Sequence, residues 1–136
     1  MKTLHLEGDI TAADTRTALT AQGSVSAPSL VTPPDAKMIT MLYGSICSEG
    51  LAAGAQSFFV RIGGNAVRNG EQVIMISAAG MIAVQSGSDA APQLMVPIVL
   101  KDLDIEIGPS DTVSIAVEGA GTDTGTAHAA ITLVFA

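Results

Sequence analysis

The chain has 136 residues, which suits a single domain and is too short for two. Hydrophobic residues make up 48% of it and charged residues only 14%, well below the roughly 25% typical of globular proteins. The net charge of −7 with six scattered basic residues predicts no direct nucleic-acid binding, and no apolar run reaches the about 20 residues of a transmembrane helix.

The N-terminal segment, residues 1–29, is the least regular part of the sequence. Small and apolar residues of 10–21 recur at helical spacing, but the same stretch alternates as a strand, and its threonines favour extended backbone. We therefore predict 1–29 as an N-terminal arm or edge strand of one domain that spans 1–136. Pro33 and Pro34 then lead, in extended conformation, into the first core strand.

The middle of the chain shows a period of two in short segments that end at Gly, Asn, Asp or Ser. Residues 37–47 are apolar on both faces, which is typical of a central strand. Strands are also predicted at 56–64 and 72–77, with a tight turn at Asn69–Gly70 in which both residues would have positive φ.

The C-terminal third continues the pattern. Pro97 interrupts "LMVPIVL", so this strand is expected at a sheet edge or with a bulge, because proline cannot donate to the ladder. "GPSD" at 108–111 is a type I or II turn, and the alternating segments 112–118 and 127–135 follow it. Seven or eight strands predict an all-β, antiparallel β-sandwich.

Acidic residues gather at one point of this pattern. Asp102, Asp104 and Glu106 alternate with apolar residues, so on a strand they would line one face. Such a face is usually solvated, but it is also our candidate for a calcium ion or a subunit contact, because hard cations take several carboxylate oxygens. No EF-hand spacing is present, and we predict no resident metal or other cofactor.

The loop "EGAGTDTGTA" is the best candidate for specific recognition. Its candidate interface residues are Thr122, Asp123, Thr124 and Thr126. The alternative is a long hairpin whose Asp and Thr side chains satisfy their own backbone. His5 and His128 are far apart in sequence and are predicted as outward-facing strand residues, and Cys47 as a buried free thiol.

Three stretches together show a family resemblance: "TPPDAKMITMLYGSICSEG", "SFFVRIGGNAVRNGEQVIMI" and "LDIEIGPSDTVSIAVEGAGTDTGTAHAAITLVFA". Their strand rhythm, and the turn that feeds the penultimate strand, resemble small viral single jelly-roll coat or decoration proteins over roughly residues 30–136. The resemblance implies a single jelly-roll of about eight strands. It also implies a location in the virion capsid or surface, and partners that are copies of the chain, as a trimer or larger assembly, and other virion proteins.

Two functions are compatible with these patterns. The first is a structural protein that self-assembles into a virion capsid or surface shell, since a charge-poor surface is typical of interface cores. The alternative is a ligand-binding β-sandwich module for calcium-dependent adhesion or carbohydrate binding, although the chain has few aromatic residues for a sugar. We predict no enzymatic activity and no catalytic residues, because no nucleophile motif or cluster of histidines and acids stands out.

Overall fold

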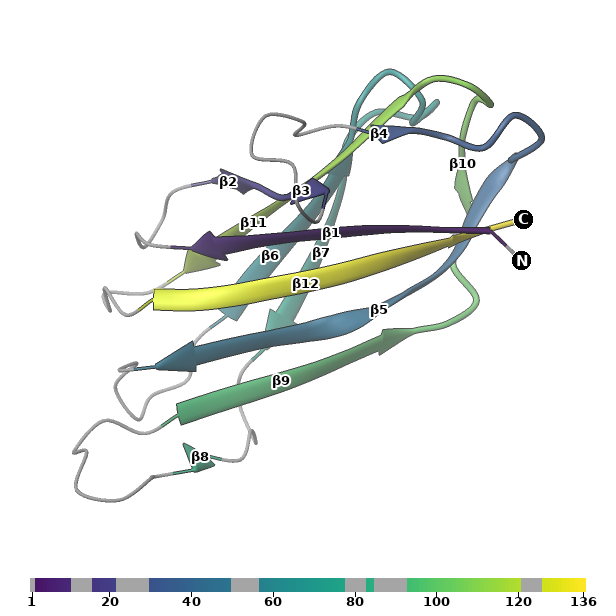
Figure 1. Cartoon of the computed structure of the whole chain (residues 1–136). Helices are drawn as coiled ribbons and strands as arrows, with labels where there is room; N and C mark the ends of the chain where they lie inside the picture. Colours follow the sequence, from purple (N-terminus) through teal and green to yellow (C-terminus); the bar gives the residue numbers. More distant parts are fainter. Residues whose placement is uncertain are drawn as a thin grey trace.

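The computed structural model describes residues 2–10, 16–21, 30–49, 57–77, 83–84, 93–120 and 126–136. These residues form strands and turns without a helix, and the strands make two antiparallel sheets, which confirms the predicted all-β sandwich (Figure 1). The strands are β1 (Lys2–Ile10), β2 (Thr17–Ala18), β3 (Thr20–Ala21), β4 (Leu30–Val31), β5 (Met38–Glu49), β6 (Ser57–Gly63), β7 (Gln72–Ser77), β8 (Ala83–Val84), β9 (Gln93–Leu100), β10 (Ile105–Glu106), β11 (Thr112–Ala120) and β12 (Thr126–Phe135). The described part of the chain holds no helix that is both long and apolar enough to cross a membrane.

The order of the strands is that of a single jelly-roll. The larger sheet runs β3-β1-β12-β5-β9-β8, with β10 also on β5, and the smaller sheet runs β2-β11-β6-β7, with β4 also on β11 (Figure 1). The first and last long strands, β1 and β12, are neighbours, and the chain crosses between the sheets from β5 to β6 and from β11 to β12. Of the eight strand positions of a jelly-roll, the long strands occupy seven, and the short β2 and β4 share the eighth, beside β11.

The core lies between the two sheets and follows the alternation in the sequence. Ile131 and Leu133 of β12 are fully buried, as are Ile115 and Val117 of β11 in the facing sheet. The residues that alternate with them on β11, such as Ser114 and Ala116, are only partly buried because they point to the outer face. The period of two therefore places the apolar side chains in one layer between the sheets.

Gly44 lets the two central strands of the larger sheet approach closely. It lies opposite Ile131 with φ +158°, and a Cβ at this position would be 1.9 Å from the carbonyl oxygen of Ala130. Because that contact is with backbone, no side-chain rotation relieves it. Only glycine fits at this point of β5.

Thr32 closes the turn that precedes β11. Ser110 has φ +53°, so the Pro109–Ser110 turn has the positive φ at its second central residue that a type II turn requires. The buried Thr32 hydroxyl donates to the carbonyl oxygen of Gly108 (2.7 Å) and accepts from the amide of Asp111 (3.0 Å). A side chain thus takes the place of the turn's own hydrogen bond and ties it to the segment after β4.

Two sequence expectations about turns and edges have different outcomes. Gly70 has φ +82° but Asn69 does not have positive φ, and β6 and β7 are joined by residues 64–71, so the predicted tight turn with two positive φ angles is wrong. The connection is longer because Ala66 and Val67 turn back into the core. At Pro97 the prediction is confirmed: β9 pairs with β5 there, whereas the described β8 reaches only residues 93 and 94.

The described N-terminal residues lie at the borders of both sheets: β3 and β1 end the larger sheet, and β2 lies beside β11 in the smaller one. β1 pairs along its whole length with β12, from Lys2 opposite Phe135 to Ile10 opposite Ala127. On its other side the described residues that pair are Leu6 and Glu7, with β3. Residues 16–21, which allowed both a helical and a strand interpretation, lie in β2, β3 and the residues beside them.

Candidate functional site

Both histidines of the chain meet at one carboxylate on the outer face of the larger sheet. His5 Nε2 lies 2.7 Å from Glu7 Oε1, and His128 Nε2 lies 3.6 Å from Glu7 Oε2. Asp9 completes this histidine–carboxylate cluster, because its Oδ1 lies 2.7 Å from His128 Nδ1. The register of β1 on β12 brings these residues together by placing Asp9 directly opposite His128.

The cluster is an exposed set of charge-assisted hydrogen bonds. His5 also contacts the hydroxyl of the buried Thr132, at 2.7 Å from Nδ1. The hydrogen bond from His5, and the nearby His128, lower the pKa of the Glu7 carboxyl below its usual range. The prediction that both histidines face outward is confirmed, but sequence reasoning missed that they converge. Pairing of the first and last strands, had it been predicted, would have placed the two histidines close together.

The acidic residues predicted as an ion or subunit contact do not share one strand face. Only Ile105–Glu106 forms the strand β10, and Asp102 has φ +58°, which is a turn conformation. All three carboxylates are exposed, as predicted, and Glu106 Oε1 lies 3.9 Å from Arg68 Nε. Within the described ranges no three His, Cys, Asp or Glu side chains are grouped so that they could hold a metal ion. A role for Asp102 and Asp104 in subunit contact stays a prediction.

The predicted recognition loop lies largely outside the described residues. This is so for Thr122, Asp123 and Thr124. Thr126 is the first residue of β12 and is opposite Glu49 of β5. Cys47 is a free thiol in β5, as predicted, but it is only partly buried.

Among the described residues, exposed apolar side chains form one pair on each sheet. On the outer face of the larger sheet Tyr43 is opposite Val99, and these side chains are 40% and 61% exposed. On β7, at the border of the smaller sheet, Val73 and Met75 are 49% and 64% exposed. Val31 in β4 is a further exposed residue, and among the described residues no other large exposed apolar side chain lies on β4 or on its partner strand β11. The sequence signal for β7 was "QVIMIS", which has no charge and no proline.

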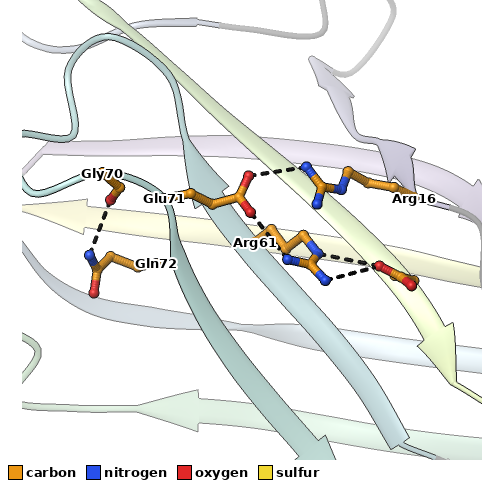
Figure 2. A network of polar contacts seen from close by, with 6 residues as sticks. Arg16, Arg61, Gly70, Glu71 and Gln72 are labelled. Carbon is orange, nitrogen blue, oxygen red and sulfur yellow. Dashed lines mark hydrogen bonds and ion pairs between the residues drawn. The ribbon is translucent and has the colours of Figure 1, made fainter.

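An ionic network covers the outer face beside β7. Arg61 of β6 lies between two glutamates: its Nη1 is 3.1 Å from Glu71 Oε1, and its Nη2 is 3.2 Å from Glu118 Oε2. Figure 2 shows Arg61 beside Glu71. Arg16 adds a second contact to Glu71, at 3.2 Å (Figure 2). Two arginines and two glutamates neutralise each other here, so this network contributes no net charge to a surface of an otherwise acidic chain.

A small cavity of about 170 Å³ lies where the two ends of the chain meet. It is lined by Lys2, Asp35, Ala36, Phe135 and Ala136. Lys2 and Asp35 form an ion pair across it. The hydrogen bond that Lys2 donates in this pair lowers the pKa of the Asp35 carboxyl. Sites for drug-sized ligands typically have about 300–1,000 Å³, so this cavity is small for such a ligand.

The comparisons with known proteins give no family assignment. No protein-family model and no curated protein matches the chain. A structure of infectious bursal disease virus, Gx strain, is similar at 14% identity and a TM-score of 0.35, covering 96% of this chain and 33% of that one. A structure of the Gt strain is similar at 15% identity and a TM-score of 0.31, covering 95% and 31%. The chain spans about a third of the length of these two chains, and similarity at this level identifies no function.

Proposed function

We propose that the chain is a structural protein that self-assembles, through contacts between its copies, into a virion capsid or surface shell. The observation that supports this most is the presence of two separate exposed apolar surfaces. The first consists of Tyr43 and Val99, and we call it the outer surface. The second consists of Val73 and Met75, and we call it the β7 surface. A subunit of an extended shell needs more than one contact surface, because a single self-complementary surface yields only a closed pair.

The composition supports the same proposal. Low charge content leaves few groups to be desolvated when copies pack side by side, and depletion of charge is typical of the buried centre of interfaces. The viral setting comes from the resemblance in strand rhythm. In this proposal the partners are further copies and other virion proteins, and the protein needs no cofactor and performs no catalysis.

Sedimentation of the full chain over a range of concentrations tests this function. We expect species of trimer size or larger that grow with concentration. V99K should weaken this association, because it places a charge in the outer surface. V31K is the matched control: Val31 is the same residue type with the same 61% exposure, but among the described residues it stands alone, and V31K should associate like the wild type.

A different result would favour the other class of function. A monomer at every concentration, with a melting temperature that rises when calcium is added, would contradict the assembly proposal. It would support the ligand-binding β-sandwich module instead.

A further inference from the structure

In the part of the chain that the structure describes, β7 is the open border strand of the smaller sheet. Among the described residues it pairs only with β6, through six consecutive residues from Gln72 to Ser77 (Figure 1). Border strands usually carry charges, prolines or bulges that prevent pairing with another chain. β7 has none of these, since its residues are uncharged and its register on β6 is continuous.

The hydrogen-bonding direction of β7 follows from its neighbours. The amide of Leu19 donates to the carbonyl of Ile115, so Ile115 points its main-chain groups toward β2. In antiparallel sheets these groups alternate in direction along each strand, so Ala116 and its partner Arg61 bond to each other, and Val60 bonds to Ile74. The main-chain groups of Val73 and Met75 therefore point away from β6, toward the open border.

The side chains at this border are also incompletely covered. Val73 and Met75 project from the outer face and are about half exposed or more. Ile74 and Ile76 point inward and pack against the core, yet they are only partly buried, whereas Val60 on the neighbouring β6 is fully buried. A further strand beside β7 would cover apolar side chains on both faces of the sheet.

Electrostatics favour a second copy of the chain at this border over most other parts of its surface. Copies with a charge of −7 repel one another, but β7 is uncharged and Glu71 next to it is neutralised by Arg16 and Arg61. In an antiparallel pair Glu71 of one copy lies near Ser77 of the other, so no like charges are opposed.

We propose that a second copy of the chain pairs antiparallel with β7 across a twofold axis at Ile74. This pairing places Val73 of each copy opposite Met75 of the other, so that the outward main-chain groups bond and the exposed apolar side chains form cross-strand pairs. It joins the two smaller sheets into one continuous sheet. The inference rests on the proposed function and specifies one of its contacts, the self-complementary one.

The contact is small, and its size limits how strongly two copies associate through it alone. One six-residue strand pair covers less than the about 1,000 Å² that a stable isolated dimer needs. The β7 pair is therefore weak by itself and is strengthened when other contacts hold the same copies together.

V73P is the sharpest test, because proline at this position removes only an amide that points away from β6 and leaves the β6–β7 ladder complete. We expect V73P to keep the thermal stability of the wild type within a few degrees and to lower the association constant about tenfold or more. M75K, which places a charge at the centre of the pair, should do the same. Association of V73P and M75K equal to that of the wild type would overturn the proposal.

Cross-linking tests the register independently of assembly size. In a C47S background, an equimolar mixture of V73C and M75C chains should form disulfide dimers faster than either chain alone, because only the mixture places the two sulfurs opposite each other. Equal rates would overturn this register. If wild-type shells form and V73P shells form equally well, the pairing is wrong but the proposed function stands. If the mixture cross-links but the wild type never grows beyond a dimer, the pairing stands and the shell function is wrong.

Discussion

Replacement of Thr32 by valine is the clearest test of how the turn before β11 is held. Valine has nearly the shape of threonine but lacks the hydroxyl, so T32V removes the bonds to Gly108 and Asp111 and leaves the packing unchanged. The hydroxyl is buried, with Thr32 only 1% exposed, so water does not readily replace these partners.

The expected cost follows from the two hydrogen bonds that are lost. Each contributes about 0.5–1.5 kcal/mol net, so T32V should lower the free energy of unfolding by about 1–3 kcal/mol. The hydrogen bond from the Thr32 amide to the Asp111 carbonyl, at 2.8 Å, is retained in T32V and limits the loss to this range.

Chemical denaturation of wild type, T32V and T32S measures this cost. T32S keeps the hydroxyl and should lose less than half as much stability as T32V, despite the missing methyl group. If T32V is as stable as the wild type, or if T32S is the less stable of the two, the hydroxyl does not hold the turn and the reasoning is wrong.

Two further predictions concern the larger sheet. G44A should lower the free energy of unfolding by about 3 kcal/mol or more, because its Cβ would meet the Ala130 carbonyl oxygen at 1.9 Å. The control G70A, in open space at φ +82°, should lower it by only about 1 kcal/mol. Equal losses in chemical denaturation would refute the close approach of β5 and β12. The hydrogen bond from His5 lowers the pKa of Glu7 in the folded protein, so the ionised Glu7 stabilises the fold above its ordinary pKa of about 4.3, and this stabilisation is lost as pH falls through the lower folded pKa. Between about pH 5 and 2 the melting temperature should therefore fall less steeply for E7Q than for wild type. Parallel melting curves would contradict this.

The sequence predicted the sandwich because its core strands alternate so regularly. In β11 the apolar residues Val113, Ile115 and Val117 are the buried ones, and the period of two is a property of the backbone that needs no knowledge of strand order. Turn geometry was less predictable. At 102–106 the alternation of acids and apolar residues continues through a turn, so the pattern resembled a strand that begins only at Ile105.

The candidate sites depended on contacts that no local pattern contains. His5 and His128 are at opposite ends of the sequence, and they meet only because β1 and β12 pair with one particular register. Likewise, the "QVIMIS" segment predicts a strand equally well in the middle or at the border of a sheet. Its exposure follows from the order of the strands, and that order is set by packing across the whole domain.

Electron microscopy of the concentrated protein tests most directly whether its copies assemble into a shell. We expect closed particles or ordered arrays in which each subunit contacts its neighbours through β7 and through the surface of Tyr43 and Val99. Isolated subunits at the highest attainable concentration, or particles in which both surfaces face solvent, would contradict it.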